Sequence, residues 1–373
     1  MRGGRMTPSK IPEFIAGLKL SELFYSEAVS PILASNFPTV RYSASLLGSG
    51  SEVLGFDTIQ STDHHWGPRL QVFLSDDDSA TYAKRIDKAL SEQLPRQFRG
   101  YSTNFGPPDQ IGVRLPRDIE LGPVSHLVEI TTIQSFFGSF LGIDPDDELQ
   151  VIDWLTIPEQ RLLSVTVGGV FHDGLGRLNQ VRQKFSYYPR DIWLYLLAAQ
   201  WSSIAEEEAF IGRTGDVGDE LGSRIIAARL VRALMKLCFL MERQYAPYGK
   251  WFGTAFGRLT CSKKLAPIFR EVLRAESWQE REQYLSRAYS LVAEMHNALG
   301  ITQPLDTKVS PFYNRPYKVI HSDQFAYDIR KAINDQEVRK IRVSIGSIDQ
   351  FVDCTDIMSE PQLYRRLRTM FEQ

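Results

Sequence analysis

The chain has 373 residues, of which 43% are hydrophobic and 24% are charged, and its formal net charge at pH 7 is −2. This composition is typical of a globular protein, and the length favours two domains over a single core. A nearly neutral charge gives no electrostatic footprint for nucleic acid or for an anionic membrane. We therefore expect a small molecule or a protein as partner, and no nucleic acid.

The cysteines and the N-terminus indicate the compartment. Cys238, Cys261 and Cys354 are odd in number and far apart, which argues against a disulfide framework and fits a reducing environment. They contain no Cys-x-x-Cys pair, so structural zinc is not expected. The basic N-terminal segment lacks the apolar stretch of a secretory signal, and no run reaches the roughly 18 apolar residues of a membrane span. The sequence predicts a cytoplasmic protein without a membrane segment.

The first 145 residues alternate short strands with helices, after a flexible tail over residues 1–10. Helical spacing of apolar residues predicts a helix over 18–33, kinked at Pro31, and another over 80–94 that the acidic run at 76–78 would start. Extended apolar runs predict strands over 42–47, 69–74 and 124–132. We expect a small domain of sheet and helices over residues 11–145.

Long helical patterns replace this alternation after residue 145. They cover residues 190–211, 220–245 and 278–299, and the first half of 190–211 is apolar nearly all round, as in a helix central to a bundle. Only residues 164–171 suggest a strand in this region. We expect a helical bundle over 146–300 and a C-terminal extension over 301–373. The predicted fold class is therefore α+β, with a small mixed-sheet domain followed by a helical bundle domain.

The residues that suggest chemistry begin after the first predicted strand. Gly48-Ser49-Gly50-Ser51 forms a turn of small residues, and Asp63 follows shortly before the strand that starts at Arg69. Small residues let backbone amides approach a triphosphate, and an acid downstream can hold Mg²⁺ against the same phosphates. Glu129 lies within the predicted strand 124–132 and can supply a further acid.

This order of turn, acid and distant strand acid resembles the nucleotidyltransferase superfamily that includes DNA polymerase beta and the kanamycin and lincosamide nucleotidyltransferases. The chain more specifically resembles an uncharacterised branch, domain of unknown function family 4037, from about Leu18 to about Leu299. The phrases that carry this resemblance are GSEVLGFD, STDHHWGPR, WLTIPEQRLL, FHDGLG, YYPRDIWLYLLAAQW and EEEAFIGRTGDVGDELGSR. It implies a nucleotidyltransferase-like mixed sheet joined to a helical bundle.

The resemblance also implies an activity and a site. The activity is transfer of a nucleoside monophosphate from a nucleoside triphosphate, with Mg²⁺ or Mn²⁺, to a small hydroxylated molecule or a protein. The residues implied for catalysis and metal binding are Asp63, His65 and Glu129. Those implied for nucleotide binding are Gly48, Ser49, Gly50, Ser51, Arg69 and Lys250.

His65 departs from the superfamily pattern, because it stands where the second carboxylate is usual. Imidazole prefers Zn, Cu or Ni to Mg²⁺, so either the metal differs, or another acid such as Asp57 contributes, or catalysis is lost. The alternative function is therefore a catalytically degenerate nucleotide- or protein-binding module on the same fold. A second alternative is a transition-metal hydrolase site at Asp63-His64-His65, for which His126 is the further histidine of this domain.

Other polar clusters have both a functional and a structural interpretation. Arg69 can contact a phosphate or a carboxylate, or can be a solvated charge on a strand. By resemblance to the antibiotic nucleotidyltransferases, one glutamate of Glu206-Glu207-Glu208 can act as a general base, although a solvated helix end is the plainer interpretation. The aromatic and lysine cluster after the third helical pattern also has two interpretations. It can stack on a base and hold a phosphate, or it can be a packed junction between helices; its residues are Tyr245, Tyr248, Lys250 and Trp251.

Overall fold

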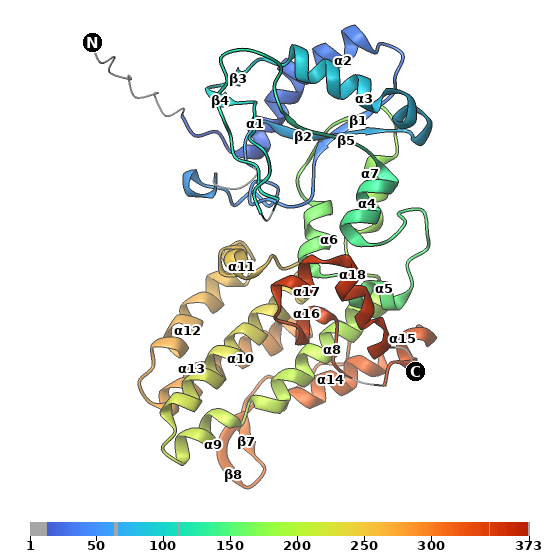
Figure 1. Ribbon diagram of the computed structural model, residues 1–373. Helices are drawn as coiled ribbons and strands as arrows, with labels where there is room; N and C mark the ends of the chain where they lie inside the picture. The colour runs from blue at the N-terminus through green and yellow to red at the C-terminus, as the bar shows by residue number, and fades with distance from the viewer. Residues whose placement is uncertain (1–12, 63–65, 111, 343, 372–373) are drawn as a thin grey trace, which may run out of the picture. The chain divides into compact units, whose positions relative to one another are not determined.

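The computed structural model describes residues 13–62, 66–110, 112–342 and 344–371 (Figure 1). The chain divides into two compact units. Unit 1 comprises Met1–Asp147 and Leu163–Ser186, and unit 2 comprises Glu148–Leu162 and Tyr187–Gln373. The combination of a small mixed sheet with many helices confirms the predicted α+β fold class.

Unit 1 is built on a sheet that has four strands among the described residues, in the order β5-β2-β1-β6. The central strand β2 runs antiparallel to β1 and parallel to β5, while β1 also pairs antiparallel with β6. The bounds are β1 Ser43–Leu46, β2 Arg69–Leu74, β5 Leu127–Thr132 and β6 Gly169–Asp173. The fourth strand therefore comes from a segment far beyond the first three.

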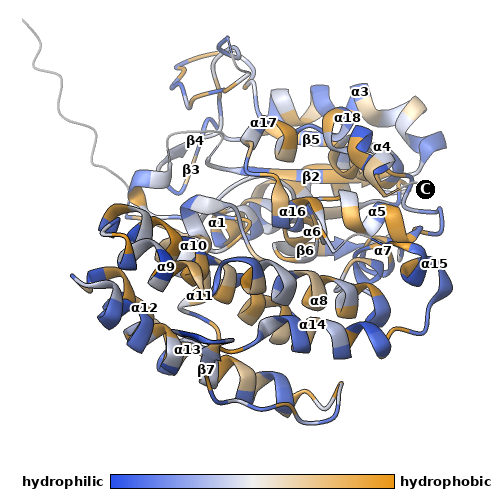
Figure 2. Ribbon diagram, turned by 90° about the horizontal axis from the view of Figure 1, so that it is seen from below, coloured by the Kyte–Doolittle hydropathy of each residue, from blue (hydrophilic) through white to orange (hydrophobic). Residues whose placement is uncertain are grey.

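Both faces of the sheet are covered, as the sequence RLQVFL of β2 requires. Five of its six residues are buried, and the strand is largely orange in Figure 2. Leu70, Val72 and Leu74 belong to a core that includes residues of the N-terminal helices and of α3. On the opposite face, Phe73 packs edge-on against Phe136 of α4, with ring centroids 5.5 Å apart. The α-helices that lie wholly within unit 1 are α1 Gly17–Phe24, α2 Ser30–Asn36, α3 Asp76–Gln93, α4 Ile133–Leu141 and α7 Leu178–Lys184.

The predicted helix starts of unit 1 have identifiable causes. Tyr25–Val29 forms a π-helical turn between α1 and α2, and Pro31 lies in the first turn of α2, directly after it. The hydroxyl of Ser75 accepts a hydrogen bond from the Asp78 amide and so caps α3, whose first turn is acidic. A short hairpin, β3 Gln97–Phe98 with β4 Tyr101–Ser102, follows α3, and a 3-10 turn covers Ile59–Ser61.

Unit 2 is a helical assembly around α8 Arg190–Glu207. The residues from Ile192 to Trp201 are all buried, which confirms that the first half of this helix is buried all round. α10 and α14 pack against α8, and α13 packs against α10 and α12. The bounds are α5 Val151–Thr156, α9 Phe210–Asp216, α10 Glu220–Met241, α11 Gly249–Phe256, α12 Ser262–Arg274 and α13 Trp278–Ala298.

The segment after residue 300 is part of unit 2. Phe325 of α14 stacks on Trp201 of α8 with ring centroids 4.4 Å apart, so this segment completes the core around α8. Its elements are β7 Ser310–Phe312, β8 Arg315–Val319, α14 Ser322–Lys331, α15 Gln336–Lys340, α16 Ile348–Phe351, α17 Thr355–Ser359, α18 Pro361–Tyr364 and a 3-10 turn Arg365–Met370. No helix among the described residues has the length and apolar character needed to cross a membrane.

Two sequence predictions of elements were wrong. The strand expected over 164–171 begins only at Gly169, because residues up to Thr166 continue helix α6 Glu159–Thr166. The helix expected over 190–211 ends at Glu207, and α9 begins at Phe210. Glu208 directly follows the end of α8. Its carboxylate accepts hydrogen bonds from the backbone amides of Ile320 and Ser322, which are distant in sequence.

Candidate functional site

The turn of small residues, 48–51, follows the end of β1, which lies beside the start of β2 in the sheet. Gly48 and Gly50 have φ angles of 87° and 139°, which other residues rarely adopt. A Cβ atom on Gly50 would lie 2.5 Å from a carboxylate oxygen of Glu52 and 2.6 Å from the Arg69 guanidinium. Glycine is therefore required at Gly50 both by the backbone and by its neighbours.

Gln71 of β2 fixes the beginning of this turn. Its side chain accepts a hydrogen bond from the Leu47 amide at 3.0 Å and donates one to the Leu47 carbonyl at 3.1 Å. Gly48 follows directly, and its amide donates to the carbonyl of Ser164 at 2.9 Å. The buried glutamine thus satisfies backbone groups that would otherwise be unpaired at the end of a strand.

An arginine and a glutamate hold the rest of the turn. Arg69, the first residue of β2, donates through Nε and Nη2 to one carboxylate oxygen of Glu52, at 2.8 and 2.6 Å. Its Nη2 also donates to the Ser49 carbonyl at 2.6 Å. Glu52 is 4% exposed, so this ion pair is largely shielded from water. Of the alternatives for Arg69, the structure therefore has the one in which it contacts a carboxylate.

Glu129 lies on β5 directly beside Gln71 in the parallel register. The Gln71 amide and the Arg69 charge both act on the Glu129 carboxylate. Both groups favour the ionised form, yet partial loss of hydration at the sheet surface raises the pKa of Glu129, although the residue is exposed. Arg69, Gln71 and Glu129 alternate with the core residues Leu70, Val72 and Val128, so they share the other face of the sheet.

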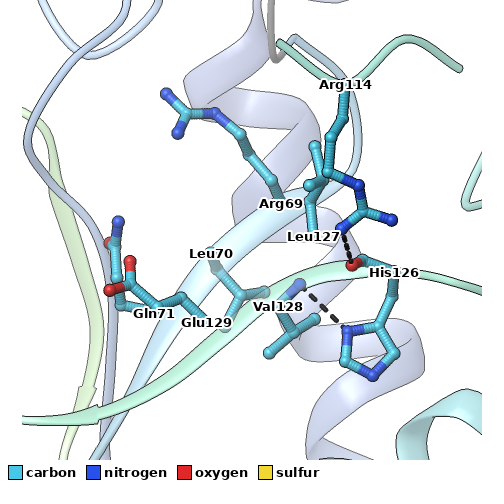
Figure 3. A pocket seen from close by; sticks show the side chains of 8 residues that line it. All are labelled: Arg69, Leu70, Gln71, Arg114, His126, Leu127, Val128 and Glu129. Carbon is cyan, nitrogen blue, oxygen red and sulfur yellow. Dashed lines mark hydrogen bonds between the residues drawn. The ribbon is translucent and has the colours of Figure 1, made fainter. Parts of the chain in front are cut away.

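These side chains line an open pocket of about 250 Å³. In Figure 3, Gln71 and Glu129 lie together on one side of the pocket, while Arg114 reaches in from a loop and contacts the backbone of His126. Arg114 also donates to the carbonyls of Phe105, Gly106 and Ser125, so it holds the loop that forms the wall. The pocket thus offers one carboxylate, one amide and two guanidinium groups that already have protein partners.

Other residues weighed from the sequence have structural partners. Asp57 accepts hydrogen bonds from the Gly17 amide at 2.7 Å and from Trp66 Nε1 at 3.0 Å, so it fixes the start of α1. His126 accepts at Nδ1 from the Val128 amide, while Nε2 lies 3.2 Å from the Asp87 carbonyl. Burial lowers the pKa of His126, which keeps the ring neutral. Neither ring nitrogen of His126 is thus available to a metal in this arrangement.

The polar residues of unit 2 are also engaged. Lys250 is exposed in α11, with its ammonium 5.0 Å from the centre of the Trp251 ring, while Tyr245 packs in the core against Tyr187 and Tyr188. Of the three glutamates at 206–208, Glu207 pairs with Arg229 and Glu208 accepts hydrogen bonds at the start of α14. Burial raises the pKa of Glu208 to about 7.

The structure brings together Glu129, Arg69 and the turn at 48–51, as the sequence suggested. Asp63 and His65 lie outside the described residues. Sequence reasoning missed Glu52 and Gln71, which position the turn. The available signals were an acid directly after the small residues and an uncharged polar residue inside an otherwise apolar strand.

Comparison with known proteins finds a family match for one segment of the chain. Residues 154–252 match the model of a family described as a domain of unknown function (DUF4037). The predicted resemblance to this family is confirmed over a shorter range than the predicted Leu18 to Leu299, and this range contains neither the turn nor Glu129. No curated protein matches the chain.

A solved structure shows a distant likeness to this chain. The crystal structure of a nucleotidyltransferase-like protein from Exiguobacterium sibiricum 255-15, at 1.90 Å resolution, aligns with 84% of this chain and 89% of its own. The two chains are 10% identical and the TM-score is 0.33. A similarity of this size is too low to support a shared activity.

Proposed function

We propose that the chain transfers a nucleoside monophosphate from a nucleoside triphosphate to a small hydroxylated molecule or a protein. The observation that supports this proposal best is the convergence of Glu129 with the 48–51 turn on one face of the sheet. Gln71 joins them, because its amide contacts both Leu47 and Glu129. A triphosphate on the turn would then lie close to a carboxylate, which is what nucleotidyl transfer requires.

In this proposal the protein binds the phosphates mainly through backbone amides. The Gly48 amide is already bonded to the Ser164 carbonyl, so the contacts fall to the residues from Ser49 to Ser51. Arg69, which lines the pocket, holds the Ser49 carbonyl and thereby fixes the turn beside it. Lys250 stays a proposed nucleotide contact from unit 2.

The proposal includes Mg²⁺ or Mn²⁺ bound by Asp63, His65 and Glu129. Glu129 fits such a role, because oxygen ligands suit these ions and the residue is exposed where it lines the pocket. Within the described residues, no three His, Cys, Asp or Glu side chains are placed to hold a metal ion, so the site depends on Asp63 and His65. A bound ion would supply charge neutralisation at the phosphates.

The test is an activity assay with each of the four labelled nucleoside triphosphates and either Mg²⁺ or Mn²⁺. We expect pyrophosphate release that falls at least about 100-fold in Glu129→Gln and in Asp63→Asn, since each change removes a charge at the reacting phosphates. Glu120→Gln changes an exposed acid outside the pocket and is the matched control. Equal rates in the wild type, Glu129→Gln and Asp63→Asn would refute the proposal.

A binding module without transfer is the second candidate. His65 in place of an acid favours it, and so does the pairing of Arg69 with Glu52, which occupies a cation that could otherwise meet a phosphate. In that case a nucleoside triphosphate would raise the melting temperature of the wild type, and no pyrophosphate would appear with any metal.

A further inference from the structure

Two of the three cysteines, far apart in the sequence, meet in unit 2. Cys238 is in the last turns of α10 and has no exposed surface, whereas Cys261 directly precedes α12 and is partly exposed. Both thiols are free. The Cys261 side chain lies within hydrogen-bonding reach of the Cys238 sulfur.

Glu242 holds the two cysteines in this arrangement. Its backbone amide donates to the Cys238 carbonyl at 2.9 Å. Its carboxylate accepts from the amides of Thr260 and Cys261, each at 2.8 Å, and also bonds the Cys261 side chain. One residue therefore links the end of α10, where Cys238 lies, to the segment just before α12, where Cys261 lies.

We propose that Cys238 and Cys261 are a redox pair that closes to an intramolecular disulfide when a peroxide oxidises the protein. The partly exposed Cys261 reacts first. Its thiolate attacks one oxygen of hydrogen peroxide, and the O–O bond breaks. Cys261 becomes a sulfenic acid, and the other oxygen departs as water with the proton that the thiol gave up. The Cys238 sulfur then attacks the Cys261 sulfur, the S–O bond breaks, and the oxygen leaves with the Cys238 proton as a second water. Two thiols are oxidised and one peroxide is reduced to two waters.

The surroundings of the pair set the order and speed of these steps. Cys238 is shielded from solvent, so peroxide reaches Cys261 before it. The contact with Cys261 and burial raise the pKa of the Cys238 thiol, and we therefore expect the second step to be slow and to accelerate with pH. The disulfide would enclose α11 between its ends and restrict the unfolded chain there.

The test uses the full chain with Cys354→Ser, because Cys354 is exposed and would otherwise cross-link between molecules. After treatment with hydrogen peroxide and alkylation under denaturing conditions, mass spectrometry should show a loss of about 2 Da and a cross-linked peptide that contains both cysteines. A thiol reductant should restore both thiols. The oxidised form should melt several degrees higher than the reduced form.

Two variants distinguish the proposed pairing from unrelated oxidation. In Cys261→Ser the cross-link should be absent, and in Cys238→Ala the oxidation of Cys261 should continue to the sulfinic acid. The Cys354→Ser protein retains the native pair, so its peptide map does not depend on the folding of either variant. The proposal is wrong if Cys238 stays fully alkylatable while Cys261 is oxidised, or if neither reacts.

Discussion

The two units neutralise their half-buried and buried carboxylates in different ways. In unit 1, Glu52 has one cationic partner, Arg69, at 2.6 Å. In unit 2, Glu159 and Asp349 share Lys236: the Asp349 carboxylate accepts from the Glu159 amide at 3.0 Å, and Lys236 donates to the Asp349 carbonyl. Two carboxylates and one ammonium leave an excess negative charge. The charges of the unit 2 cluster are therefore unbalanced, whereas Glu52 and Arg69 in unit 1 form a one-to-one pair.

The pKa values of the unit 2 cluster are shifted mainly by burial, and for Glu159 also by this excess charge. Burial, followed by the charge of Asp349, raises the pKa of Glu159 to about 8, while burial raises that of Asp349 to about 6. Burial and the charge of Arg232 lower the pKa of Lys236. Tyr187, Tyr188 and Tyr245 also face Glu159. In the unit 2 cluster, burial raises the pKa of both carboxylates, and the charge of Asp349 adds to the effect on Glu159.

The largest effect is expected when the one-to-one pair is broken. Glu52→Gln would leave Arg69 without its counter-charge in a shielded position, so we expect the free energy of unfolding to fall by about 3 kcal/mol. Glu27→Gln is the matched control, because Glu27 and Arg99 form the same kind of pair with both side chains over 40% exposed. We expect the control to cost less than about 1 kcal/mol. Urea denaturation measures both, and equal losses would contradict the role given to burial.

A smaller effect, confined to a pH window, is expected when the unit 2 cluster is made one-to-one. Because the pKa of Glu159 is raised from 4.5 to about 8, its protonated form stabilises the fold at low pH. That contribution is lost as the pH rises from about 4.5 to about 8. Glu159→Gln keeps a neutral side chain at every pH. We expect the wild type to lose about 1–2 kcal/mol relative to this variant across the window.

The difference between the two proteins isolates Glu159 from other titrating groups. Glu208, whose pKa is about 7, contributes equally to both and cancels, as does any group outside the cluster. The informative range is pH 6 to 8, above the pKa of about 6 of Asp349. Urea denaturation at several pH values measures the difference. Parallel stability curves over this range would show that Glu159 is ionised throughout and would remove the contrast between the units.

The sequence predicted the fold best where one local pattern decides the structure. β2 was predicted with its observed bounds, because RLQVFL is apolar with a polar start and is followed by a helix-capping Ser75. The end of α8 was not predictable, because Glu208 leaves the helix to bond amides of Ile320 and Ser322. Nothing near Glu208 in the sequence indicates that partner.

The candidate site shows the same division. Glu129 and the turn at 48–51 were chosen by motif, and the sheet register places them close together through Gln71. The partner of Arg69 depends on how the turn folds back, which spacing alone does not reveal. The cysteines are the clearest case: their separation argued against pairing, yet Glu242 brings Cys238 and Cys261 into contact.

Asp57 provides a third way to neutralise a carboxylate and the smallest expected effect. It has N–H donors, from Gly17 and Trp66, in place of a cation or a proton. Asp57→Asn keeps one oxygen that can accept a hydrogen bond but loses the charge that strengthens it, so we expect unfolding to be easier by about 1 kcal/mol. Because both donors fix the start of α1, any nucleotide transfer should be unchanged. If this variant lost metal-dependent transfer but kept its stability, Asp57 would instead belong to the metal site. It would then supply the second carboxylate, at whose usual position the chain has His65.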